Sequence, residues 1–305
     1  MSERLSVLKT YKLYVGGKFP RSESGRVYEV TTRTSAADAA GNGKWLANAP
    51  LSSRKDARDA VVAARKAFGG WSGATAYNRG QILYRIAEML EGRRDQYVAE
   101  VADAEGLSKS KAAAQVDAAI DRWVWYAGWT DKIAQVVGGG NPVAGPFFNL
   151  SSPEPTGVVA VLAPQKSSFL GLVSVVAPVI ATGNTAVVVA SEKSPLPALS
   201  LGEVLATSDL PGGVVNILSG RTAEIAAPLA AHQDVNAIDL AGADEELAKE
   251  LEIAAADNLK RVLRPQPVDN ADWSATPGTD RMTAFLETKT VWHPTGALGA
   301  SGSSY

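Results

Sequence analysis

From residue 157 onward, short runs of apolar, β-branched residues alternate with longer segments of helical character. The runs cover 157–163, 185–190, 214–218 and 235–240, and the helical segments cover 169–181, 196–207, 222–231 and 244–256. Strands that are apolar at every position are buried on both faces. Their alternation with helices is typical of a parallel sheet that helices cover on both sides. The pattern therefore predicts an α/β fold with a doubly wound parallel sheet.

The part of the chain before this sheet repeats apolar residues at helical spacing. Three helices are predicted, with apolar faces along 57–68, 82–101 and 116–134. Ser52 or Ser53 can serve as the N-cap of the first helix. The glycines at 138–140 end the third helix.

Both ends of the chain have β-like patterns. Residues 11–15 alternate apolar and polar before two glycines, and a second β-like run ends at residue 31, so a hairpin is predicted over 11–31. Residues 265–283 are rich in Pro, Asp and Gly and predict a linker. A β-like run within 284–296 predicts a last strand. The Gly/Ser-rich residues 297–305 predict a disordered tail.

Composition limits the chemistry more than it limits the fold. The chain has 305 residues and a net charge of −2, so nothing favours binding to nucleic acid or to an anionic membrane. The longest apolar run, 169–181, is too short to span a bilayer, and the first residues lack a segment of signal-peptide character. We expect a cytoplasmic protein.

The sequence contains no cysteine. This excludes disulfides, thiolate metal sites and cysteine nucleophiles within these residues. His232 and His293 are the two histidines. Two histidines make a His-based metal centre or a Ser-His relay improbable.

Several segments resemble the aldehyde dehydrogenase superfamily, in that family's order. They are 60–97 and 114–133 in the helical part, and 177–189, 191–199 and 209–220 in the sheet part. The resemblance covers about residues 9–262 and the final strand. It implies a Rossmann-like cofactor-binding domain over 9–264 and a small oligomerisation sheet built by the 11–31 hairpin and the C-terminal strand. It also implies that the family's catalytic domain is absent.

The motifs with which this family performs its chemistry are altered here. The turn PWNFP, whose Asn stabilises the oxyanion, corresponds to residues 164–168, so Lys166 stands at the Asn position. The KPSE motif, whose Lys and Glu hold the adenosine ribose, corresponds to 189–192 and keeps only Glu192. The FTGS motif beside the pyrophosphate corresponds to 240–243 and keeps only Gly242.

Two further departures concern the cofactor site and the general base. Acidic residues follow the altered FTGS motif at 244–246; they satisfy the helix N-terminus and repel a pyrophosphate. The family's NLKRVTLELGG motif supplies a general-base Glu, but residues 258–262 are followed here by Leu263 and Arg264, and Pro265 stands where the Glu is expected. The resemblance therefore implies that nucleophile, base and oxyanion donor are all missing.

Three residues remain as candidates for a degenerate cofactor site. Lys166 could form a Schiff base or bind an anion, or be a solvated loop lysine. Glu192 could hold a ribose, or be a surface carboxylate after a strand. Gly242 could serve a tight strand-to-helix turn whatever is bound. No catalytic or metal-binding residue is predicted and no cofactor is firmly predicted, while weak NAD(P) binding stays open.

These observations predict a pseudoenzyme. The chain is similar to the degenerate second half of the two-domain aldehyde dehydrogenases of family sixteen. The leading hypothesis is a non-catalytic structural or regulatory subunit, in an oligomer with a full-length NAD-dependent aldehyde dehydrogenase or with itself. The alternatives are an oxidoreductase of altered chemistry that retains weak NAD(P) binding, and a nucleotide-sensing module.

Overall fold

The centre of the molecule is a five-stranded parallel sheet. A computed structural model describes residues 7–33, 43–264 and 272–296. The strand order is β7-β6-β5-β8-β9, with β5 (Val158–Leu162), β6 (Thr185–Val189), β7 (Val215–Leu218), β8 (Ala237–Asp239) and β9 (Arg261–Leu263). The four predicted strands are confirmed. The sequence did not indicate β9, because it is three residues long and only partly buried.

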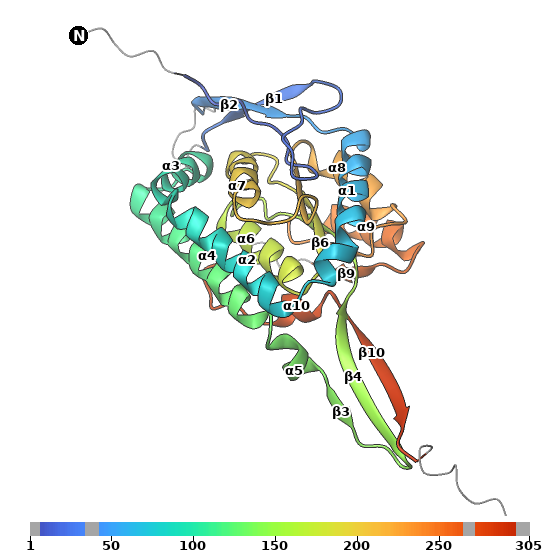
Figure 1. Ribbon diagram of the computed structural model, residues 1–305. Helices are drawn as coiled ribbons and strands as arrows, with labels where there is room; N and C mark the ends of the chain where they lie inside the picture. The colour runs from blue at the N-terminus through green and yellow to red at the C-terminus, as the bar shows by residue number, and fades with distance from the viewer. Residues whose placement is uncertain (1–6, 34–42, 265–271, 297–305) are drawn as a thin grey trace, which may run out of the picture.

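Helices cover both faces of this sheet (Figure 1). One layer holds α1 (Arg54–Ser72), α8 (Thr222–Ala230) and α9 (Glu245–Ala256); the other holds α2 (Ala76–Glu91), α3 (Arg94–Glu105), α4 (Lys109–Trp129), α6 (Leu170–Ala181) and α7 (Leu196–Ala206). Successive residues of β5 face opposite layers: Val159 and Val161 join the core under α4 and α6, whereas Val158, Ala160 and Leu162 join the core under α1 and α8. The predicted doubly wound α/β architecture is confirmed.

The helix boundaries correct two predictions. The helix predicted over 82–101 is two helices, because α2 ends at Glu91 and α3 begins at Arg94. The helix predicted over 116–134 ends at Trp129, and α5 (Ile133–Val137) follows it. Leu90 and Tyr97 are both fully buried on either side of the first break, so the apolar periodicity runs through a turn that it cannot detect. Ser53 is the N-cap of α1, in a capping box with Asp56.

The predicted hairpin over 11–31 is wrong in its pairing. β1 (Val27–Thr31) pairs with β2 (Trp45–Pro50), not with the 11–15 segment. Tyr14 instead exchanges backbone hydrogen bonds with Ile217 of β7, at 3.1 and 2.6 Å. The sequence indicated two β-like runs and a turn, but it does not encode that each run finds its partner farther along the chain.

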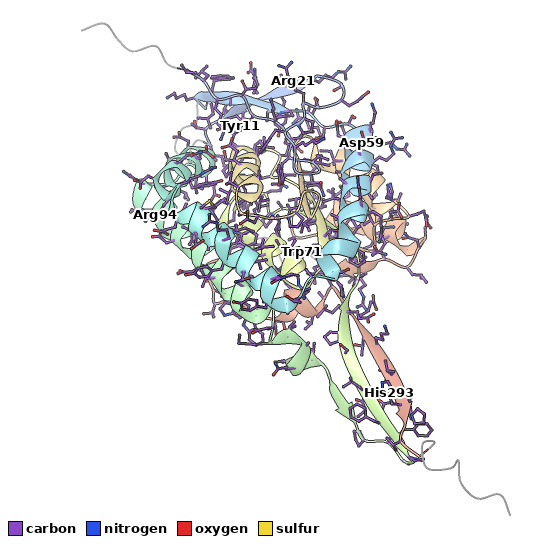
Figure 2. The ribbon with its side chains drawn as sticks, viewed as in Figure 1. Tyr11, Arg21, Asp59, Trp71, Arg94 and His293 are labelled. Atoms are coloured by element: carbon purple, nitrogen blue, oxygen red, sulfur yellow. The ribbon has the colours of Figure 1, made fainter. Side chains whose placement is uncertain are left out.

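A second sheet projects from the body as an arm (Figure 1). Its order is β10-β4-β3, with β10 (Leu286–Pro294), β4 (Phe147–Pro155) and β3 (Gly139–Asn141). The predicted C-terminal strand is therefore confirmed as a strand, but it pairs with β4 and not with the N-terminal hairpin. Figure 2 shows His293 on this arm, away from the body. β4 was not predicted, because Asn, Ser, Glu and Pro interrupt its apolar residues.

The segment expected to be a linker is packed structure where it is described. Within 272–283, α10 (Asp280–Thr283) buries Met282, and Arg281 forms an ion pair with Asp239 at the end of β8. Residues 265–271 and the predicted tail 297–305 lie outside the described residues. In the part of the chain that the structure describes, no helix is long and apolar enough to cross a membrane.

Candidate functional site

The candidate site is the edge of the sheet where the parallel strands end. In open α/β sheets this carboxyl edge is where ligands bind. The sequence motifs at 164–168, 189–192 and 240–243 follow β5, β6 and β8, which are neighbours in the sheet. The structure therefore brings Lys166, Glu192 and Gly242, the candidates for a degenerate cofactor site, to one edge of the sheet.

The turn after β5 is held by side chains from its surroundings. Gln165 bridges two strand ends, because its Nε2 donates to the carbonyl of Ala163 at 3.1 Å and its Oε1 accepts the N–H of Glu192 at 2.9 Å. The carboxylate of Glu105 accepts both the N–H and the hydroxyl of Ser168, at 2.7 Å each. Burial raises the pKa of Glu105. Such a turn is fixed before any ligand arrives.

Lys166 lies at the exposed apex of this turn. Its carbonyl accepts a hydrogen bond from Arg33 Nη1 at 3.3 Å, and Arg33 Nη2 donates to the carbonyl of Gln165. The side chain of Lys166 lies outside the core, in contrast to the buried Ser167 and Ser168 that follow it. This position fits a loop lysine better than a Schiff-base lysine, whose amine is normally activated by desolvation.

Glu192 is engaged by the protein itself. Its two carboxylate oxygens accept from Arg221 Nη1 at 2.7 Å and from the N–H of Thr222 at 3.0 Å. Thr222 is the first residue of α8. The carboxylate therefore accepts an N–H that has no partner within the helix. A helix N-terminus of this kind stabilises an anion. The hydroxyl of Tyr28 donates to the Glu192 carbonyl at 3.1 Å, and desolvation raises the pKa of Tyr28.

Gly242 is required by a close approach of two backbones. A Cβ at this position would come within less than 3.0 Å of the carbonyl oxygen of Ala163. The turn after β8 thus lies directly against the end of β5. Asp244 begins the next helix as N-cap, and its side chain accepts the N–H of Leu247 at 2.9 Å. The structural explanation of Gly242 is sufficient without a ligand.

Sequence reasoning missed Asp239 and Arg281. Asp239 ends β8 with no exposed surface, accepts the N–H of Ala241 at 3.0 Å and is paired with Arg281. Burial raises the pKa of Asp239, while the Arg281 guanidinium opposes that rise. The available signal was an aspartate inside an otherwise apolar strand, which requires a partner. That partner lies in the segment interpreted as a linker.

These residues do not fit the dinucleotide that the sequence resemblance implies. The N-terminus of α8 is occupied by Glu192, and that of α9 by Asp244, with Glu245 and Glu246 exposed beside it. Val189 is fully buried at the position of the ribose lysine. A pyrophosphate placed here would meet carboxylates where it needs donors.

This edge has neither a cysteine nucleophile nor a metal-binding cluster among its described residues. The sequence has no cysteine, and among the described residues no group of three or more His, Asp or Glu side chains could hold a metal ion. His232 follows α8, and His293 lies on the arm (Figure 2). The arrangement stabilises turns and helix ends. The Ser168 hydroxyl contacts the Glu105 carboxylate at 2.7 Å, and that carboxylate also accepts the N–H of Ser168, so the contact holds the turn after β5.

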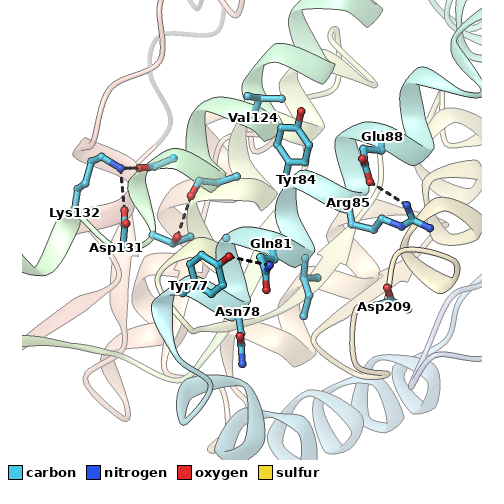
Figure 3. A pocket seen from close by; sticks show the side chains of 15 residues that line it. Tyr77, Asn78, Gln81, Tyr84, Arg85, Glu88, Val124, Asp131, Lys132 and Asp209 are labelled. Atoms are coloured by element: carbon cyan, nitrogen blue, oxygen red, sulfur yellow. Dashed lines mark hydrogen bonds and ion pairs between the residues drawn. The ribbon is translucent and has the colours of Figure 1, made fainter.

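A separate hollow of about 880 Å³ lies between α2 and α4 (Figure 3). Its polar side chains pair with one another: Gln81 Nε2 donates to the hydroxyl of Tyr77 at 3.2 Å, and Arg85 is bound to Glu88 at 3.0 Å. None of the residues at the carboxyl edge of the sheet lines it. It has no evident relation to the candidate site.

Comparison with known proteins agrees with this architecture. Residues 29–270 match the description "Aldehyde dehydrogenase family". Chicken (Gallus gallus) retinal dehydrogenase 2 is 33% identical over 84% of this chain and 48% of its own length. Cytosolic 10-formyltetrahydrofolate dehydrogenase of Mus musculus is 30% identical over 85% of this chain and 28% of its own length. The chain thus spans about half or less of the relatives that it matches.

Solved structures give the same result. The NAD+ complex of an aldehyde dehydrogenase from Bacillus cereus has a TM-score of 0.77 and 26% identity, over 83% of this chain and 50% of that one. HpcC from Thermus thermophilus has a TM-score of 0.77 and 29% identity, over 83% of this chain and 47% of that one. The fold, the matched residues and these relatives together show that the chain belongs to the aldehyde dehydrogenase family.

Proposed function

We propose that this protein is a non-catalytic structural or regulatory subunit, which assembles with a full-length NAD-dependent aldehyde dehydrogenase through its β-arm. The arm is defined here as β3, β4 and β10. The observation that supports the proposal best is the arm's uncovered surface. A two-stranded hairpin is at best marginally stable in water, and most of the arm is two-stranded because β3 pairs with three of the nine β4 residues that pair with β10. The arm gains stability when another chain covers it.

Apolar side chains are exposed on both faces of the arm. Phe148 is opposite His293, and the neighbouring pair is Asn149 and Trp292. Because consecutive pairs point to opposite faces, Phe148 and Trp292 lie on different sides. Phe147, Phe148, Leu150 and Trp292 each expose between 37% and 55% of their surface. Exposed apolar clusters of this kind mark interaction sites.

The arm also has a long unpaired edge. Among the residues that the structure describes, β10 is the outer strand, and its nine residues pair only with β4. The opposite strand, β3, covers only three residues of β4. An edge strand with free N–H and C=O groups is a template for a strand from another chain. β-Strand addition along β10 is therefore the proposed mode of assembly.

The altered family motifs at the carboxyl edge of the sheet support a non-catalytic role. Glu192 and Asp244 occupy two helix N-termini, and Lys166 stands at the position of the oxyanion Asn. The family similarity suggests which partner to test, because a full-length member shares the same fold over the matched half. Self-association through the same arm is the second candidate, favoured by the same uncovered edge.

Co-expression with full-length aldehyde dehydrogenases, followed by size-exclusion chromatography, tests the proposal. The diagnostic variant lacks residues 288–305; it keeps the buried Phe285 and the Arg261–Glu287 ion pair of 2.6 Å. A matched substitution pair is Phe148→Ser on the arm and Val62→Ser on the exposed face of α1. Only the arm variants should abolish co-elution. An intact protein that stays monomeric with every homologue tested, or a truncated one that co-elutes unchanged, contradicts the proposal.

A further inference from the structure

A cavity of about 240 Å³ separates α4 from the segment 272–281. It lies beside the carboxyl end of β9, and neither the arm nor any of Lys166, Glu192 and Gly242 lines it. Two arginines from different helices line the cavity, Arg122 on α4 and Arg281 on α10. The aromatic ring of Trp273 lines it as well. Leu263 and Pro277 add apolar surface.

Arg122 is a buried cation without an acidic partner in contact. It is 7% exposed. Its Nη1 donates to the hydroxyl of Ser174 at 2.6 Å, its Nη2 donates to the carbonyl of Ala275 at 2.7 Å, and its Nε has no acceptor. Both acceptors are neutral, and no carboxylate lies within ion-pair distance of Arg122 in the described parts of the chain. Desolvation lowers the pKa of Arg122, and Tyr126 and Asp272 only partly oppose this. A buried charge of this kind is normally compensated.

Arg281 contributes a second guanidinium to the same cavity. Its Nη1 is paired with Asp239, and its guanidinium lies 5.3 Å from the centroid of the Trp273 ring. A guanidinium has five N–H donors, and no other acceptor for Arg281 is found among the residues that the structure describes. The charge of Arg281 is balanced by Asp239, whereas Arg122 has no carboxylate partner among the residues that the structure describes.

The cavity's other charges define what it can accept. Arg264 lines it but is paired with Glu252 at 2.8 Å. Asp272 and Asp280 lie at the exposed side and oppose a second negative charge on a ligand. One unpaired guanidinium favours one negative charge, and Trp273 favours an apolar body beside it.

We propose that this cavity binds a small organic monocarboxylate, with its carboxylate beside Arg122 and its apolar part against Trp273. A phosphate dianion fits less well because of the two rim aspartates. The volume accommodates a compound of about the size of benzoate, since ligand pockets bury most of their ligand's surface. The inference concerns residues outside the proposed assembly surface and does not depend on it.

The test is calorimetry on the full chain with sodium benzoate, at constant ionic strength, with benzamide as the neutral probe of the same shape. Tryptophan fluorescence is a second readout. We expect saturable benzoate binding that is at least about tenfold tighter than benzamide binding, since a hydrogen bond to a charged group is worth about that factor. Arg122→Met should weaken benzoate binding by a similar factor, and Arg122→Lys should weaken it less.

Two further variants separate binding from folding. Thr276 lines the cavity from its exposed side, so Thr276→Trp should obstruct the ligand while leaving the core intact, and it decides the matter if Arg122→Met does not fold. Arg94→Met removes a surface arginine that is paired with Asp117 and should leave binding unchanged. The proposal would be overturned if benzoate showed no saturable binding, or if inorganic phosphate bound as tightly as benzoate. It would also be overturned if Arg122→Met and Thr276→Trp bound benzoate as tightly as the unmodified protein does.

Discussion

The carboxylate of Glu192 accepts the backbone N–H of Thr222 at 3.0 Å, so a residue in the turn after β6 caps the helix that follows β7. An internal carboxylate thereby takes the position at which this edge of an α/β sheet can hold a ligand anion. The surviving glutamate of the family motif has become part of the scaffold. Its loss should affect stability and not the binding of a nucleotide.

Replacing Glu192 with Gln should lower the free energy of unfolding by about 1 kcal/mol, because a charged cap is lost from the N-terminus of α8. The value is modest because the side chain is 29% exposed. The matched control is Glu224→Gln, in the first turn of the same helix, which should change stability less. Urea denaturation of both variants measures the difference. Equal stability of the two variants would refute the capping role.

Replacing Gly242 with Ala should destabilise the protein by about 3 kcal/mol, since an added methyl group collides with the backbone carbonyl of Ala163, which cannot move aside as a side chain can. The control is Gly69→Ala in α1, where nothing lies within 4 Å of the added atom. That change should stabilise the helix by about 0.5–1 kcal/mol. Thermal unfolding of both variants checks the opposite signs.

The sequence predicts the central strands but not every strand pairing, because only local patterns can be recognised in it. β5, β6 and β7 are apolar at nearly every position because both faces are covered, so their pattern identifies them. Lys166, Glu192 and Gly242 are predicted to share a site because they stand at motif positions of the family that the sequence resembles. The 11–31 hairpin was mispaired because β1 finds its partner beyond an intervening segment. No local pattern encodes such a distant pairing.

The same limit applies to the polar contacts. Asp239 and Arg281 are 42 residues apart in sequence, and Arg281 lies in a segment whose Pro and Gly content suggested a linker. A Pro- and Gly-rich composition predicts little regular secondary structure. It does not show whether such a segment packs against the core, as Trp273 does here. The ion pair and the cavity beside it follow from tertiary structure alone.

The Asp239–Arg281 pair should show asymmetric effects of mutation. Arg281→Met leaves a fully buried carboxyl without its partner and should cost about 3–5 kcal/mol near neutral pH. Asp239→Asn should cost less, because Arg281 retains some solvent exposure, at 17%. Urea denaturation at neutral pH compares the two. A larger loss for Asp239→Asn would contradict this account of the pair.

The pH dependence of these variants has a definite sign. Burial raises the pKa of Asp239 above its ordinary value of 3.8, so the folded state binds the proton more tightly than the unfolded state does. Its contribution to stability is present below the unfolded pKa and is lost as the pH rises through the raised folded pKa. Arg281→Met removes a cation that opposes this rise. Its penalty should therefore shrink on acidification from about pH 8 to about pH 5, while Asp239→Asn should show no such trend.

The last prediction concerns the nicotinamide cofactor. Val189 is buried where the sequence resemblance places a ribose-binding lysine, and Glu192 is already bound to Arg221 and Thr222. Each charged hydrogen bond lost to a ligand is worth roughly 1.5–3 kcal/mol, so two such losses should weaken NAD binding by orders of magnitude. Calorimetric titration of the isolated protein should give no saturation at micromolar NAD. Arg221→Ala serves as the control, because it frees one oxygen of Glu192 without restoring the missing lysine and should not create affinity. A micromolar dissociation constant for the unmodified protein would show that the carboxyl edge still accepts the dinucleotide despite its carboxylates.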